Sequence, residues 1–199
     1  MADPVAPELV AATEAALERH GWAGLTGELL ADAAGLNRVT LYRRGHTPQR
    51  LLAAAVEAAA AEFRAASLAP LTHAGTAAER LRLLVDALFD LADRHLALLA
   101  GLYDGPTAVF HLGGLGATAN ASGEAVTRFE YTEPFERILR DGNADATLTT
   151  SEPHRDAVLI FNAAGWTYIH LRRSHGLAAA DARDAVHGLV ERYVLPRDG

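Results

Sequence analysis

The stretch Leu30-Ala-Asp-Ala-Ala-Gly-Leu-Asn-Arg-Val-Thr-Leu-Tyr42 decides the fold of the N-terminal region. It predicts two short helices joined by a turn, with the small Ala31 where the helices approach closely. Gly35 supplies the left-handed backbone of the turn, and Leu36 fills the angle between the helices. Asn37 can cap the second helix, because its side-chain oxygen accepts a hydrogen bond from a free backbone N–H. The pattern indicates a helix-turn-helix.

Helical periodicity extends along nearly all of the chain. Apolar residues recur at the helical spacing. Thr47-Pro48 predicts the start of one helix, and a capping box of Thr76 and Glu79 predicts the start of another. We expect Gly21 to end the first helix and a break near Thr132-Glu-Pro134. Besides the helix that follows Asn37, the expected helices cover about 8–20, 27–33, 47–63, 76–91, 124–142, 151–174 and 179–194. Residues 101–123 are rich in small residues, and no alternating run predicts a strand, so the expected class is all-α.

Composition excludes several kinds of chemistry. The 199 residues include no cysteine and no lysine, which removes disulfides, thiolate metal sites, a cysteine nucleophile, the usual phosphate-binding loop and Schiff-base catalysis. No apolar run reaches the length of a membrane span, and the first residues do not resemble a secretory signal. We therefore expect a cytoplasmic protein without a membrane partner.

Positive charge is concentrated around the helix-turn-helix. The window from Ala33 to Val56 has no acidic residue but contains Arg38, Arg43, Arg44 and Arg50. It carries +4, so the rest of the chain carries −11 within a net charge of −7. One basic island on an acidic protein suits a localised contact with phosphates rather than general polyanion binding.

Four short motifs lie in and around the helix-turn-helix: His20-Gly-Trp-Ala-Gly-Leu-Thr26, Leu30-Ala, Ala34-Gly-Leu-Asn37 and Thr40-Leu-Tyr-Arg43. Together they resemble the DNA-binding head of TetR-like transcriptional regulators, and the resemblance covers about residues 8–63. The resemblance implies a three-helix head in residues 1–46 and a helical ligand-binding and dimerisation domain in residues 47–199. It also implies a homodimer formed through the last two helices, about 152–174 and 179–194. The implied function is that of a repressor, not an enzyme, which a small-molecule effector releases from a palindromic double-stranded DNA operator. No cofactor is implied.

Three positions depart from the family pattern. Gly45 stands where an aromatic residue is usual, and Pro48 precedes Gln49 and Arg50 where a lysine usually opens the fourth helix. Val39 replaces a common glycine in the recognition helix. These departures leave the details of DNA contact open, and Arg50 is a candidate replacement for the missing lysine.

The predicted DNA contacts follow from the helix-turn-helix geometry and the family analogy. Arg38 is the first candidate for reading a base, because bidentate Arg–guanine contact is the commonest specific one, and Val39 could touch a thymine methyl group. The alternative is that Tyr42 is mainly core and that Arg43 or Arg44 is only solvated. The full predicted set is Thr26, Asn37, Arg38, Val39, Thr40, Tyr42, Arg43, Arg44, Thr47 and Arg50.

A small-molecule site is expected among the C-terminal helices, where bundles open apolar cavities. The candidate wall residues are Phe63, Tyr103, Phe110, Phe129, Tyr131, Asn162 and Trp166. We expect no metal site, since no histidines form an i, i+3 or i, i+4 pair and His170 and His175 are five apart.

Two alternatives remain open. The first is an all-α enzyme or small-molecule-binding protein with a non-functional head, in which a carboxylate pair such as Glu133 and Glu136 serves acid–base chemistry. The second concerns residues 151–174, which are apolar most of the way round. That helix needs cover on several sides, which either a second subunit or the centre of one bundle would provide.

Overall fold

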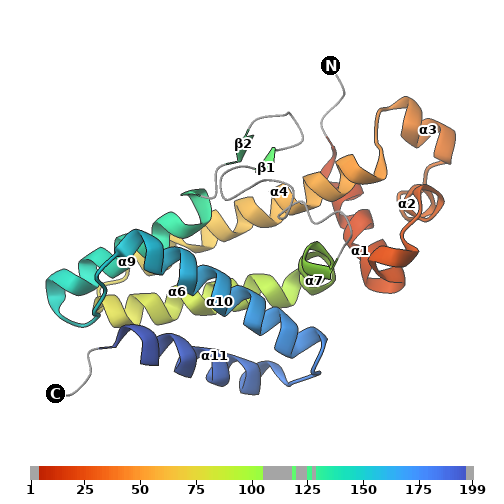
Figure 1. Cartoon of the computed structure of the whole chain (residues 1–199). Coiled ribbons are helices and arrows are strands. Elements are labelled where there is room, and N and C mark those ends of the chain that lie inside the picture. Colours follow the sequence, from red (N-terminus) through yellow and green to blue (C-terminus); the bar gives the residue numbers. More distant parts are fainter. Residues whose placement is uncertain (1–4, 105–117, 120–124, 127–128, 196–199) are drawn as a thin grey trace. The chain divides into compact units, whose positions relative to one another are not determined.

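The computed structural model describes residues 5–104, 118–119, 125–126 and 129–195 (Figure 1). Two strands, β1 (Thr118–Ala119) and β2 (Ala125–Val126), pair antiparallel. The other regular elements of the described residues are helices, so the fold is all-α, as the periodicity predicts. The helices are α1 (Pro7–Gly24), α2 (Gly27–Ala33), α3 (Arg38–Arg43), α4 (Pro48–Ala66), α5 (Leu68–Thr72), α6 (Ala77–Arg94), α7 (Leu96–Asp104), α9 (Phe129–Asp145), α10 (Pro153–Arg173) and α11 (Ala179–Val194).

The capping box predicted for α6 is confirmed. The Glu79 carboxylate accepts from the Thr76 backbone N–H at 2.7 Å, and the Thr76 hydroxyl accepts from the Glu79 N–H at 3.3 Å. These two bonds satisfy N–H groups that a helix start leaves without intrahelical partners. The bonds that the Glu79 carboxylate accepts also hold its pKa below the usual value.

Several expected boundaries were wrong. The helix expected from about residue 124 begins at Phe129, and residues 125–126 pair as β2 instead. A strand of two residues is too short to show an alternating pattern in the sequence. The helix also continues through Pro134, which lacks the backbone N–H that another residue at this position would donate within the helix. In α1 the backbone leaves helical geometry at Gly21, as expected, but one more turn follows to Gly24. Two helices, α5 and α7, were not predicted.

The chain divides into two compact units, and α4 supplies residues to both. The first comprises residues 1–61 and 95–127, and its described part contains α1, α2, α3, most of α4, and α7. The second comprises residues 62–94 and 128–199. The domain boundary after residue 46 stays a prediction.

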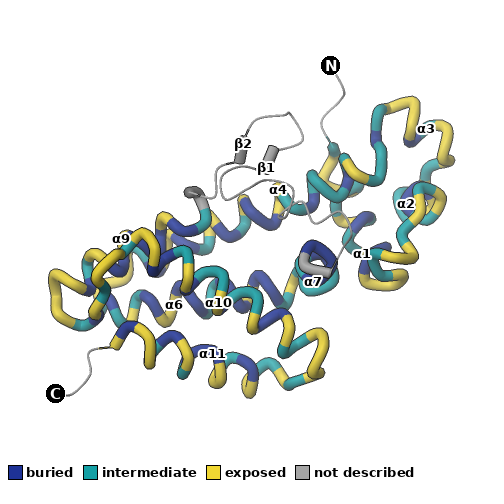
Figure 2. The backbone as a smooth tube through the Cα atoms, in the orientation of Figure 1, coloured by how far each residue is buried: buried dark blue, intermediate teal, exposed yellow. Residues whose placement is uncertain are grey.

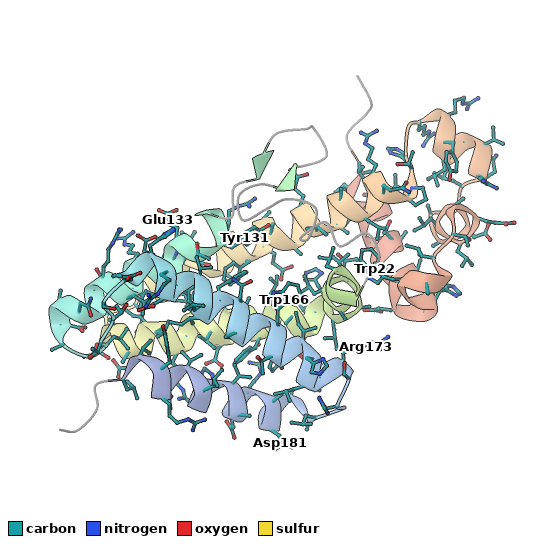
Figure 3. All side chains as sticks on the ribbon, in the orientation of Figure 1. Trp22, Tyr131, Glu133, Trp166, Arg173 and Asp181 are labelled. Carbon is teal, nitrogen blue, oxygen red and sulfur yellow. The ribbon has the colours of Figure 1, made fainter. Side chains whose placement is uncertain are left out.

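Trp22 connects α1 to α7 within the first unit, and Figure 3 labels it beside α7. Its indole Nε1 donates to the Ala97 carbonyl at 3.0 Å, and the ring packs on Gly101. Glu14 adds a contact between its carboxylate and His95 Nδ1 at 3.0 Å. These contacts join segments more than 70 residues apart in the sequence.

In the second unit, α10 packs against α6, α9 and α11. Phe89 of α6 stacks on Tyr168 of α10 with ring centroids 4.3 Å apart, and both side chains are fully buried. The apolar circumference of α10 is therefore largely covered within one chain, although Leu159 remains 47% exposed. In the described ranges, no helix is long and apolar enough to cross a bilayer.

Candidate nucleic-acid interface

The two helices of the predicted helix-turn-helix begin at side-chain caps. The Thr26 hydroxyl accepts from the Leu29 N–H at 3.3 Å at the start of α2, and Asn37 Oδ1 accepts from the Thr40 N–H at 2.7 Å at the start of α3. Both caps were predicted and are confirmed. Because side-chain caps replace missing backbone partners, such short helices can hold fixed directions.

Glycine ends both helices in the same way. Gly35 after α2 has φ +64°, and Gly45 after α3 has φ +74°. The Leu36 N–H then donates to the Ala31 carbonyl at 2.8 Å, and the His46 N–H donates to the Leu41 carbonyl at 3.1 Å. These are the bonds of a Schellman motif, which needs a left-handed residue. Gly45 therefore has a local structural role at the position where the family pattern has an aromatic residue.

A small apolar core orients α3. Leu41 is fully buried, and it clusters with Ala16, Leu30, Ala31 and Leu51. Since Leu41 faces inward, the opposite side of this short helix must face out.

The outward side of α3 carries Arg38 and Arg43 of the basic island, and Figure 2 shows this helix largely exposed. Val39 is 75% exposed and Tyr42 is 42% exposed, so Tyr42 is not a core residue, contrary to the alternative considered for it. Seven of the predicted contacts are exposed, namely Thr26, Asn37, Arg38, Val39, Tyr42, Arg43 and Arg44. The other three, Thr40, Thr47 and Arg50, are half-buried.

Thr47 and Arg50 shape the turn between α3 and α4. The Thr47 hydroxyl accepts from the Arg50 N–H at 3.2 Å, which confirms Thr47 as the predicted cap. The Arg50 guanidinium donates to the Gly45 carbonyl at 3.2 Å. The sequence did not predict this last bond, which holds part of the Arg50 side chain against the turn.

Two of the predicted effector-site residues, Phe63 and Tyr131, meet in an aromatic cluster of the second unit. Phe63 is fully buried 6.4 Å from Phe135, and Tyr131 lies 5.9 Å from Phe161, measured between ring centroids. Phe135 and Phe161 were not among the predicted wall residues, although each lies within a helix that the periodicity predicts. The rings lie as close to one another as in a packed core.

The other predicted wall residues give a mixed result. Asn162 donates from its side-chain amide to the Val158 carbonyl at 2.7 Å, and Trp166 is half-buried on α10 (Figure 3). Phe110 and the side chains of Tyr103 and Phe129 lie outside the described residues. A shallow apolar pocket of about 200 Å³ lies elsewhere, between α6 and α11, and contains none of these residues.

A polar network between α6, α10 and α11 was not predicted. Asp93 accepts from the Tyr168 hydroxyl at 2.7 Å, from Arg172 at 2.9 Å and from Arg183 at 3.1 Å. Burial alone would raise the pKa of Asp93, but these hydrogen bonds outweigh it and hold that pKa below its usual value. Burial alone would lower the pKa of Arg183, but its bonds to Asp90 and Asp93 raise it. The network joins the three helices.

The carboxylates considered for catalysis have different surroundings. Glu133 is exposed on α9, whereas Glu136 is buried and contacts Arg140 and His154 Nδ1. Since Glu136 is paired with basic groups and Glu133 faces solvent, they do not form an acid–base pair in one cleft. Among the described residues, no group of three or more His, Asp or Glu could hold a metal ion.

Solved structures with similar folds cover most of this chain. A TetR/AcrR-family transcriptional regulator from Thermobifida fusca YX-ER1 aligns with TM-score 0.66 at 18% identity, over 92% of this chain and 93% of its own. PfmR, a TetR-family regulator from Thermus thermophilus, aligns with TM-score 0.68 at 19% identity, over 92% and 97%. AibR, in complex with isovaleryl coenzyme A and operator DNA, aligns with TM-score 0.67 at 15% identity, over 92% and 95%.

These similarities concern the fold. No model of a protein family matches the sequence, and neither does any curated protein sequence. The chain has the TetR-like fold, with an N-terminal helix-turn-helix followed by a C-terminal helical domain.

Proposed function

We propose that this chain, which has the fold of TetR/AcrR transcriptional regulators, is itself a DNA-binding transcriptional regulator that works as a homodimeric repressor in the cytoplasm. The observation that carries the proposal is the outward face of α3. A capped helix held by the buried Leu41 presents Arg38, Val39 and Arg43, inside a window from Ala33 to Val56 that has no acidic residue. A helix presented in this way fits the major groove of a duplex.

Within this interface, Arg38 reads a guanine and Val39 contacts a thymine methyl group. Phosphate contacts come from Thr26, Thr40, Tyr42, Arg43, Arg44, Thr47 and Arg50, while Asn37 sets the start of α3.

The proposed dimer forms through α10 and α11. Leu159 on α10 and Leu189 and Tyr193 on α11 are 47%, 44% and 48% exposed, a large apolar exposure for two packed helices. A dimer would place two α3 helices on half-sites about 34–36 Å apart, so its operator would be palindromic. Leu189→Arg should then give a monomer in sedimentation analysis. Leu83→Arg is the matched control, because Leu83 is 40% exposed on α6.

The proposed effector is a small molecule bound by residues 47–199. AibR, the fold neighbour bound to isovaleryl coenzyme A and DNA, provides a precedent for an effector and an operator on this architecture. The candidate walls are the aromatic residues around Phe63, Tyr131 and Trp166, whose packed rings would separate to admit a ligand. An effector that favours a DNA-incompetent conformation would release the operator by shifting the population.

Selection of duplexes from a random DNA pool, followed by affinity measurements at several salt concentrations, tests the proposal. We expect an enriched palindrome and a steep loss of affinity with salt. Arg38→Ala should lower specific affinity by about 1–3 kcal/mol and relax the preference at one position, whereas Arg43→Ala should weaken all sequences alike. A folded dimer that enriches no sequence would contradict the proposal.

A further inference from the structure

Arg38 and Tyr42 lie one helical turn apart on the outward face of α3. The Arg38 Cζ atom is 5.5 Å from the centroid of the Tyr42 ring, and it lies over the ring. A guanidinium within about 6 Å of an aromatic face is attracted by the ring quadrupole. The long side chain of Arg38 is therefore held on one side by a partner from its own helix.

Gly27 makes room for the same ring. A Cβ atom at position 27 would lie 2.7 Å from the Tyr42 hydroxyl oxygen and 3.3 Å from Cε2. Gly27 is the first residue of α2, where a helix accepts alanine without strain. The absence of a side chain at position 27 thus leaves room for the Tyr42 ring, and the ring in turn lies beneath Arg38.

We propose that Tyr42, seated on Gly27, is a positioning residue that directs Arg38 towards its base. An unrestrained arginine loses side-chain freedom when it makes a planar contact with guanine, and a guanidinium already stacked on a fixed ring loses less. Tyr42 then contributes to specificity through Arg38, separately from any phosphate contact of its own hydroxyl. This inference rests on the proposed DNA-binding function.

The test compares base preferences of Tyr42→Leu, Tyr42→Phe and Gly27→Ala with those of the wild type and Arg38→Ala. Each full-length protein selects duplexes from the same random pool, and its affinity is then measured on the enriched operator and on single-base variants. We expect Tyr42→Leu to lower discrimination about 2- to 5-fold at the position that Arg38→Ala relaxes. Gly27→Ala should act in the same direction, because its methyl group displaces the ring.

Tyr42→Phe separates the ring from the hydroxyl. The aromatic face remains, so discrimination at that position should stay near the wild-type value. Any loss of a phosphate contact would lower affinity equally for all duplexes. Melting curves of each variant show whether α3 remains folded.

The proposal is overturned if Tyr42→Leu and Gly27→Ala keep the wild-type discrimination at the Arg38 position. It is also overturned if Tyr42→Phe loses discrimination as Tyr42→Leu does, because the hydroxyl would then be the active group. Failure of the wild type to enrich any duplex is a different result. It would contradict the proposed DNA-binding function itself.

Discussion

The helix-turn-helix and the centre of the second unit are stabilised over very different sequence distances. At α3, Asn37 bonds to a residue three positions away, and Arg50 bonds to one five positions away. At the junction of α6, α10 and α11, Tyr168 bonds across 75 positions and His187 bonds across 101. Short-range bonds fix the shape of a small surface, whereas long-range contacts decide which helices pack together.

The largest effect is expected from Phe89→Ala. The Phe89 ring is fully buried, stacks on Tyr168 and makes an edge contact with His187 at 5.2 Å between centroids. Its removal leaves a cavity between three helices, so we expect the free energy of unfolding to fall by about 3–5 kcal/mol in denaturant titrations. Leu83→Ala, on the exposed side of α6, should change it by less than about 0.5 kcal/mol. Equal effects would contradict the assignment of the core.

The first unit has its own long-range contact, which Gly101→Ala should disrupt. A Cβ atom at position 101 would overlap the Trp22 indole, which is held by its bond to Ala97. Either α7 or the ring must move, and overpacking of this kind costs about 1–3 kcal/mol. Gly24→Ala is the control, since its nearest neighbour, His20 Cβ, lies at 3.6 Å. A Gly101→Ala variant as stable as that control would show that α1 does not depend on α7.

Asp93→Asn should lower the free energy of unfolding by about 1–3 kcal/mol at neutral pH, because Arg172 and Arg183 lose their charged acceptor. The pKa of Asp93 is lowered in the folded state, so its contribution is present above the unfolded pKa and is lost as pH falls through the folded pKa. The wild type should therefore lose stability below about pH 4, and the variant should lose less.

Asp90→Asn provides the control for this titration. The Asp90 side chain is 53% exposed, and within the described part of the chain it bonds only to Arg183. Removing its charge should therefore lower the free energy of unfolding by at most about 1 kcal/mol. If Asp93→Asn and the wild type lose stability equally in acid, the network does not depend on the Asp93 charge.

The same contrast in sequence distance explains what the sequence could predict. The caps Thr26, Asn37 and Thr47 and the glycine turn at Gly35 depend on residues within a few positions, so the motif contained the needed information. The class of fold followed from periodicity, which is equally local. Helix ends without such signals, as at α9, were misplaced.

The missed features require knowledge of which helices meet. Nothing near Asp93 in the sequence indicates that Tyr168 and Arg183 will approach it, and nothing near Trp22 indicates Gly101. Phe161 of α10 lies beside Tyr131 only because α9 and α10 pack together, and its contact with Phe63 involves a third helix, α4. The Arg50 bond to Gly45 is local, but an arginine near a turn has many possible acceptors.

Asn37→Ala and Asn37→Asp should have the smallest effects on stability. Comparing them separates the role of Asn37 in the structure of α3 from its role in DNA binding. Alanine removes the 2.7 Å bond to the Thr40 N–H and should cost about 1 kcal/mol, measured by denaturant unfolding. Aspartate keeps an acceptor at the helix start, where negative charge is favourable, so stability should be retained. The same charge beside DNA phosphates should weaken operator binding, and more so at low salt. If aspartate leaves DNA affinity unchanged at low salt, the start of α3 does not face the duplex. The hydrogen bond of Asn37 would then stabilise the helix-turn-helix without shaping a DNA interface.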